Sequence, residues 1–66
     1  MGVAVGDYYE IGDVMFKVTH IQDGEPYGRA VLYPRSGKVI ANGKPRRIYD
    51  TRRKVTQDRL NELIDR

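Results

Sequence analysis

The chain contains no cysteine and no tryptophan, and it has only one histidine and one phenylalanine. Without cysteine, disulfides and thiolate metal sites are excluded. A lone His20 cannot hold a metal ion without several carboxylates around it, so we expect neither a metal nor another cofactor. No apolar run approaches the roughly 20 residues that cross a bilayer. Met1 to Asp7 also lacks the basic flank and apolar core of a secretory signal, so we expect a cytoplasmic protein.

The length of 66 residues corresponds to one small domain. A domain of this size buries only about 60 % of the surface that its unfolded chain exposes, so its stability is modest. Small domains without disulfides or metals often gain stability by self-association, and a homo-oligomer is therefore compatible with the sequence. A domain this small has little room for a closed catalytic pocket. We therefore expect a protein that is not an enzyme.

Charges of opposite sign are separated along the chain. Residues 1–28 carry five acids and one base, whereas Arg29 to Lys54 carries nine bases and a single acid, Asp50. The net charge of +3 therefore conceals a strongly basic segment. Such a segment attracts polyanions and releases their counterions on binding. This asymmetry is the most informative functional feature of the sequence.

Turn signals divide the first 50 residues into short segments rich in Val, Ile, Tyr and Phe, which favour strands. Val14 to Ile21 alternates with period two and predicts a strand with one face mostly buried. Tyr27 to Tyr33 predicts the next strand, which Pro34 should end because proline has no N–H for the ladder. Asn42-Gly43 can adopt the two positive φ values of a type I′ turn. We therefore expect a hairpin between strands at Lys38 to Ala41 and Arg46 to Asp50.

The C-terminal residues change to a helical period. Leu60, Leu63 and Ile64 form a narrow apolar stripe, which predicts a helix over Gln57 to Asp65. Thr56 is a favourable N-cap. Val55 before the cap and Leu60 after it fit a hydrophobic staple. Because a helix of two to three turns is unstable alone, its stripe must dock on the sheet or on a partner.

These elements predict a mainly β fold in a single domain of residues 1–66. We expect a small, five-stranded, SH3-like bent sheet or partly open barrel with a short C-terminal α-helix. The strands fall within residues 5–50, a basic connector spans 51–54, and the helix falls within 56–65. The opening Gly6-Asp7, Glu10-Ile11-Gly12-Asp13 and Phe16-Lys17-Val18 resembles that of small bacteriophage and prophage accessory proteins. That resemblance implies a non-enzymatic binder that regulates or inhibits a host system.

We define the basic strip as the candidate binding residues Arg29, Arg35, Lys38, Lys44, Arg46, Arg47, Tyr49, Arg52, Arg53 and Lys54. Arginine offers a planar fork of donors suited to phosphate, and Tyr49 can stack on a base. If Ile48 faces the core, Arg47 and Tyr49 share the solvent face. The other interpretation is a solvated face whose charges pair with Asp50, Asp58 and the acids of residues 1–28.

Two functions fit the basic strip. The first is a nucleic-acid-binding or regulatory protein that contacts phosphates, with weak sequence preference because no helix-turn-helix, zinc-finger or RNP signature is present. The second is a protein–protein inhibitor or adaptor, such as a phage product that blocks a host enzyme. In that case the strip would dock an acidic host protein, and exposed tyrosines would anchor it. The sequence does not distinguish DNA, RNA and protein as partners.

Overall fold

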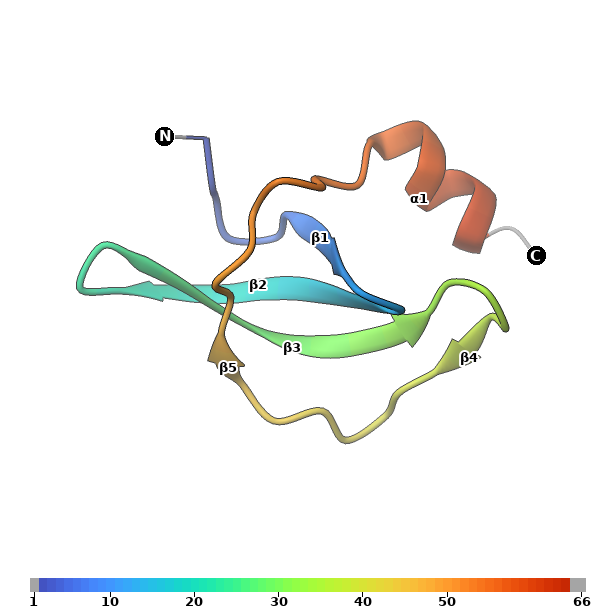
Figure 1. The fold of residues 1–66 in the computed structure, drawn as a ribbon, viewed down its shortest axis with the longest axis horizontal. Helices are drawn as coiled ribbons and strands as arrows, with labels where there is room; N and C mark the ends of the chain where they lie inside the picture. Colours follow the sequence, from blue (N-terminus) through green and yellow to red (C-terminus); the bar gives the residue numbers. More distant parts are fainter. Residues whose placement is uncertain (1, 65–66) are drawn as a thin grey trace.

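One antiparallel sheet and one helix make up the computed structural model, which describes residues 2–64 (Figure 1). The strands are β1 (Tyr8–Ile11), β2 (Val14–Gln22), β3 (Glu25–Tyr33), β4 (Lys38–Val39) and β5 (Arg46–Arg47), and helix α1 spans Gln57–Ile64. The sheet is open rather than a closed barrel. The predicted mainly β fold with a short C-terminal helix is thus confirmed. The expected helix end at Asp65 lies outside the described residues.

The long hairpin of β2 and β3 is the centre of the sheet. Gln22 pairs with Glu25, so the turn between the strands has only two residues, Asp23 and Gly24. Both have positive φ, at 54° and 77°, as a type I′ turn requires. This turn lets two nine-residue strands pair in sequence. The chain makes a tight hairpin here, as it does between β1 and β2, and not at Asn42-Gly43.

The predicted hairpin at Asn42-Gly43 is wrong. β4 and β5 do not pair with each other, because both pair with β3, one after the other along the same edge. Neither Asn42 nor Gly43 has a positive φ. The segment crosses Ala30 so closely that a Cβ on Gly43 would lie 2.4 Å from the Ala30 carbonyl oxygen. Glycine is therefore needed here for close approach, and the predicted strands are shortened to two residues each.

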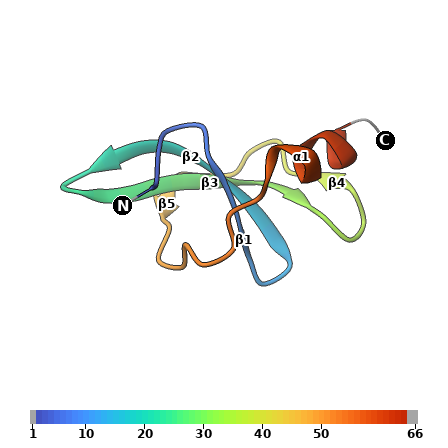
Figure 2. The same ribbon diagram turned by 90° about the horizontal axis from the view of Figure 1, so that it is seen from above.

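Hydrophobic clusters lie on both faces of the sheet. Tyr9, Val18 and Ile48 form one buried cluster. The other contains Met15 and, from the C-terminal segment, Val55, Leu60 and Leu63. The predicted face of β2 carries the fully buried Val18, and Met15, which is 3 % exposed, shows that the other face is also buried at this end of the strand. The second face is buried because α1 lies over it, at the end of the sheet away from the β2–β3 turn (Figures 1 and 2).

The segment after β5 joins the two edges of the open sheet. β5 pairs with β3 at one edge. The chain then reaches β1 at the other edge, where Lys54 forms a bridge with Tyr9 and the Val55 N–H donates to the Tyr8 carbonyl at 2.8 Å. The Glu10 N–H donates to the Arg53 carbonyl at 3.0 Å. This crossing gives the bent sheet the form of a partly open barrel.

The start of α1 follows the predicted signals. The Arg59 N–H donates to Thr56 Oγ1 at 3.2 Å, which is the N-cap hydrogen bond. Val55 and Leu60 belong to one buried cluster, as a hydrophobic staple requires. Leu60 and Leu63 dock the helix on the sheet face that carries Met15. The side chain of Ile64, the third predicted member of the stripe, lies outside the described part of the chain.

Candidate nucleic-acid interface

The fold separates the basic strip into several groups. Arg46, Arg47 and Tyr49 line one surface hollow, whereas Arg35 and Arg53 line a second. Arg52 and Lys54, both on the connector, form ion pairs with nearby acids. Three further members, placed on β3, on β4 and in the loop before β5, line none of the three hollows that are described in this subsection: Arg29, Lys38 and Lys44.

The first hollow lies where the open sheet leaves its core uncovered. We call it the β5 hollow; it has a volume of about 360 Å³, and its lining consists of Ile11, Phe16, Arg46, Arg47 and Tyr49. The two apolar residues come from β1 and β2 and pack against the buried cluster of Tyr9, Val18 and Ile48. The two arginines and the tyrosine come from β5 and the residues after it. The hollow thus combines an apolar floor with a cationic and aromatic rim.

Burial of Ile48 holds Tyr49 at the surface. Ile48 is only 2 % exposed, and its N–H donates to the Pro26 carbonyl at 2.9 Å. Because successive side chains of an extended segment point to opposite sides, Tyr49 projects outward and is 75 % exposed. The expectation that Arg47 and Tyr49 are both exposed is confirmed. Arg46 is exposed as well, and it reaches solvent at the mouth of the core rather than entering it.

The two arginines of the β5 hollow differ in their partners. Arg47 Nε lies 3.0 Å from a carboxylate oxygen of Glu25, and both side chains are about half exposed, at 58 % and 48 %. An exposed pair of this kind contributes only about 0–1 kcal/mol, so it can exchange its partner. Arg46 has no ion-pair partner among residues 2–64. Arg46 is therefore the more available cation of the hollow.

Arg52 is held by Asp50 on the connector. Its Nε and Nη2 donate to the two carboxylate oxygens at 3.1 and 2.9 Å, and its backbone N–H donates to Oδ1 at 3.1 Å. These side-chain and backbone hydrogen bonds lower the pKa of Asp50 to about 2. The same carboxylate raises the pKa of Arg52. The donor fork of Arg52 is thus already occupied, although its side chain is 88 % exposed.

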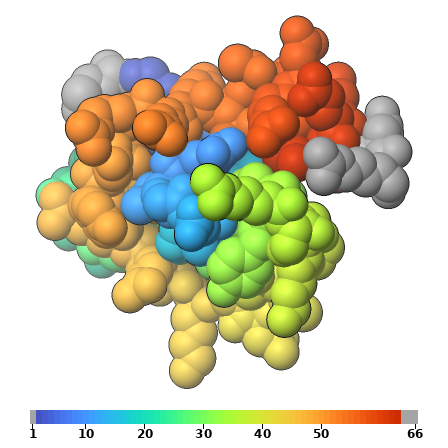
Figure 3. Space-filling model, turned by 45° about the vertical axis from the view of Figure 1, so that its right-hand side comes forward, coloured from blue at the N-terminus to red at the C-terminus, as the bar shows by residue number. Residues whose placement is uncertain are grey.

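The second hollow mixes charges of both signs. We call it the arginine hollow; it has a volume of about 250 Å³ and is lined by Glu10, Gly12, Asp13, Pro34, Arg35, Arg53 and Arg59. The β1–β2 turn separates the connector from the β3–β4 hairpin on this side of the molecule (Figure 3). Two carboxylates beside three guanidinium groups reduce its attraction for an anion. The arginine hollow is therefore less suited to phosphate than the β5 hollow.

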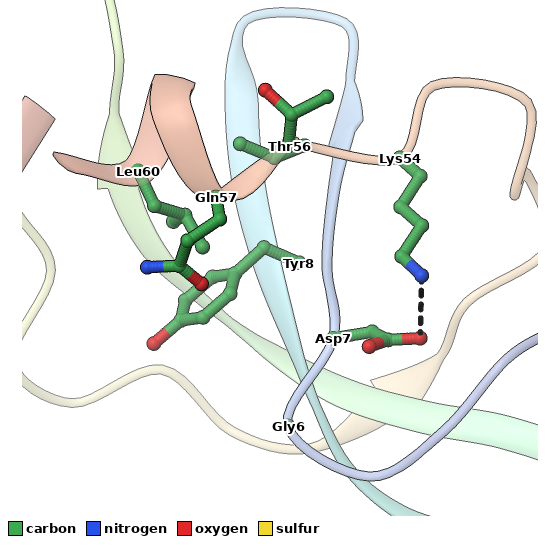
Figure 4. Close-up of a pocket in the computed structure, with 8 residues that line it drawn as sticks. Gly6, Asp7, Tyr8, Lys54, Thr56, Gln57 and Leu60 are labelled. Atoms are coloured by element: carbon green, nitrogen blue, oxygen red, sulfur yellow. Dashed lines mark ion pairs between the residues drawn. The ribbon is translucent and has the colours of Figure 1, made fainter. Parts of the chain in front are cut away.

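A third hollow, of about 420 Å³, lies between the start of β1 and the start of α1 (Figure 4). Tyr8 and Leu60 line it on one side. Lys54 and Asp7 face each other on the other side, with Lys54 Nζ 3.6 Å from a carboxylate oxygen. This pair and the Arg47–Glu25 pair are the contacts by which acids of the N-terminal half neutralise the strip within residues 2–64. Most basic side chains of the strip therefore have no ion-pair partner within residues 2–64.

Arg29, the strip residue on β3, does not line the β5 hollow. Arg29 pairs in register with Lys17, and Lys17 pairs with Tyr8. Because cross-strand partners share a face, Arg29 lies on the side of the sheet that carries Tyr8. Lys17 Nζ sits 5.7 Å from the centre of the Tyr8 ring, within cation–π range. Arg29 is thus not part of the lining of the β5 hollow.

Several residues that line these hollows are not among the predicted site residues. Phe16 and Ile11 form the floor of the β5 hollow, and Arg59 joins the arginine hollow. The alternation of β2 indicates only that Phe16 faces a core. That its ring is half-buried beside β5 depends on the strand pairing. Arg59 carries no signal beyond its place in the first turns of a helix.

Two other site classes find no support in the part of the chain that the structure describes. No group of three or more His, Asp or Glu residues there is arranged to hold a metal ion. No helix within residues 2–64 is both long and apolar enough to span a bilayer.

Comparison of the chain with protein-family models, with curated proteins and with solved structures finds no match in any of the three. The resemblance to phage accessory proteins therefore stays a prediction, and the functional argument depends on the surface itself.

Proposed function

We propose that this protein is a small, non-enzymatic nucleic-acid-binding module that contacts phosphates through its arginine and lysine side chains. The observation that carries the proposal is the β5 hollow, in which Arg46, Arg47 and Tyr49 surround an apolar floor. Phosphate contacts supply most of the affinity in such complexes, and aromatic contacts to bases add to it. The hollow offers both kinds of contact within a single site.

The free cations outside the hollow add to this attraction. Within residues 2–64, five basic members of the strip outside the β5 hollow have no ion-pair partner: Arg29, Arg35, Lys38, Lys44 and Arg53. Exposed positive side chains raise the local concentration of a polyanion over a range of about 10 Å at 0.1 M salt. A bound strand that places one phosphate at Arg46 thus remains within reach of other positive charges.

The non-enzymatic part of the proposal is supported by the interior. No charged side chain among residues 2–64 is buried. Catalytic acids, bases and nucleophiles usually depend on a desolvated setting that shifts their pKa towards the working pH. The acidic and basic side chains among residues 2–64 instead reach the solvent, where they act as charges. Binding is the chemistry that such a surface supports best.

The test is a fluorescence-anisotropy titration with short random-sequence single strands and duplexes of DNA and RNA at about 50 and 200 mM salt. For a single strand, the slope of log K against log salt is about −0.7 per phosphate contacted. Four contacts would therefore weaken binding about fifty-fold between the two salt concentrations. The absence of binding at 50 mM salt, or an affinity that does not change with salt, would refute the proposal. Either result would favour the alternative of an acidic protein partner.

A matched pair of variants tests the site itself. Arg46→Gln and Arg52→Gln each remove one positive charge, but only Arg46 lines the β5 hollow, and Arg52 is held by Asp50. We expect Arg46→Gln to reduce the single-strand salt slope by about 0.7 and Arg52→Gln to change it much less. Equal effects of the two substitutions would mean that binding depends on net charge and not on this site.

A further inference from the structure

We propose that the β5 hollow recognises single-stranded nucleic acid by taking up one unstacked base against Tyr49. This inference rests on the proposed function, and it adds the class of strand and the mode of contact. The hollow presents two aromatic rings, from Phe16 and Tyr49, and two guanidinium planes, from Arg46 and Arg47. Aromatic and guanidinium faces are the groups on which unpaired bases stack.

A duplex cannot use these faces. In double-stranded nucleic acid the faces of each base are covered by its neighbours, so proteins reach only phosphates, sugars and base edges. A single strand can turn one base out of its stack at little cost and place it in the hollow. Phosphates on either side of that base then lie near Arg46 and the exposed Arg47. The hollow thus discriminates by the accessibility of base faces.

The backbone on either side of Tyr49 is held in place before any ligand arrives. On one side, Ile48 anchors the backbone in the core and through its hydrogen bond to Pro26. On the other side, the carboxylate of Asp50 accepts hydrogen bonds from the backbone and side chain of Arg52. An aromatic ring presented by an ordered backbone loses less conformational entropy on binding. Asp50, through its hydrogen bond to the backbone N–H of residue 52, therefore helps to order the segment that presents the stacking ring.

The two arginines of the β5 hollow differ in how readily they can contact a phosphate. Arg47 shares its guanidinium with Glu25, whose carboxylate repels an incoming phosphate. Arg46 has no such partner among residues 2–64 and lies on β5, next to the apolar floor. We therefore assign the main phosphate contact to Arg46 and the stacking contact to Tyr49.

The experiment compares three labelled ligands of about ten nucleotides, a length within the range that small ssDNA-binding modules cover. These are a single strand, a hairpin duplex of the same base composition, and a strand of the same length whose sugars carry no bases. We expect the single strand to bind about fivefold to 150-fold more tightly than the duplex and the base-free strand, which is the usual contribution of one stacked base. The base-free strand keeps every phosphate, so it isolates the stacking contribution.

Three variants locate the effect. Tyr49→Ala should abolish the preference for the single strand and leave its salt slope unchanged, whereas Tyr49→Phe should keep the preference. Tyr33→Ala is the matched control, because Tyr33 is also exposed, at 39 %, but lies at the β4 end of β3, outside the β5 hollow. Since Tyr49 is 75 % exposed, Tyr49→Ala should fold normally, and far-ultraviolet circular dichroism checks this.

The outcomes separate the two proposals. Equal, strongly salt-dependent binding of all three ligands would overturn this inference and leave the proposed function standing. A preference for the single strand that survives Tyr49→Ala would also overturn it, because another surface would then read the base. No binding of any ligand at about 50 mM salt would overturn both. Loss of the preference in Tyr49→Ala alone would support both.

Discussion

Gly28 is the position where one added methyl group should do the most damage. It is buried in β3, where it pairs with Val18 of β2 on one side and with Arg46 of β5 on the other. A Cβ at this position would lie 2.2 Å from the Lys17 carbonyl oxygen and 2.7 Å from Ile48 Cδ1. Ordinary C···O contacts are about 3.3 Å, so β2 and β3 would have to separate by about 1 Å.

The cost of Gly28→Ala follows from this geometry. Overpacking costs about 1–3 kcal/mol, and the upper end applies because the closest atom belongs to the backbone of a central strand. The alanine also restricts the unfolded chain, which returns about 0.4–1 kcal/mol. We expect a net loss of about 2 kcal/mol. A domain of this length has a total stability of about 3–10 kcal/mol, so the midpoint of thermal unfolding should fall by about 10 °C.

Urea unfolding followed by circular dichroism measures the change in the free energy of unfolding. Gly24→Ala is the control: nothing lies within 4 Å of its Cβ, but its φ of +77° is costly for alanine, by about 1 kcal/mol. If Gly28→Ala costs no more than Gly24→Ala, the close contact between β2 and β3 at this point is refuted. The m-value should stay unchanged in both variants, because the surface exposed on unfolding is the same.

Two further predictions concern the connector and the helix. Thr56→Ala should lower the free energy of unfolding by about 1 kcal/mol because it removes the acceptor for the Arg59 N–H, whereas Thr56→Ser should retain it; thermal unfolding measures both, and an equal loss in the two would contradict the capping role. Because Arg52 holds the pKa of Asp50 at about 2, below its ordinary 3.8, the ionised carboxylate adds stability that is complete above about pH 4 and is lost as the pH falls through about 2. Urea unfolding of the protein and of Asp50→Asn should therefore give a difference that shrinks towards low pH, and a difference that is constant with pH would refute the assignment.

Features set by neighbouring residues could be predicted. Thr56 caps α1 because its hydroxyl reaches an N–H three residues later, and no distant residue takes part. The strand at Val14 to Ile21 follows from the alternation of apolar and polar residues, although Met15 on its other face is buried as well. The exposure of Tyr49 follows from the burial of its neighbour Ile48. In each case the cause lies within a few residues of the effect.

Features that depend on which segments meet could not be predicted. Asn42-Gly43 is a strong local turn signal, yet the chain uses Gly43 to pass close to Ala30, and β5 pairs with β3. The basic strip lies within one stretch of the sequence, Arg29 to Lys54, but the fold places its members in several groups. Three of its basic residues also form ion pairs, with Asp7, Glu25 and Asp50. A run of like charges indicates attraction to an anion without showing where the charges lie in space.

The composition and the local patterns of this chain are enough to predict its strand-rich class, its capped helix and the positive charge of the segment from Arg29 to Lys54, because these depend on residue type and short-range spacing. The tertiary structure decided which of the predicted site residues act together. Arg46, Arg47 and Tyr49 become a site only when β5 pairs with β3 and brings them beside Ile11 and Phe16, more than 30 positions away for Tyr49. Such contacts are decided by the packing of the whole sheet, in which each strand can pair only where its side chains and backbone fit.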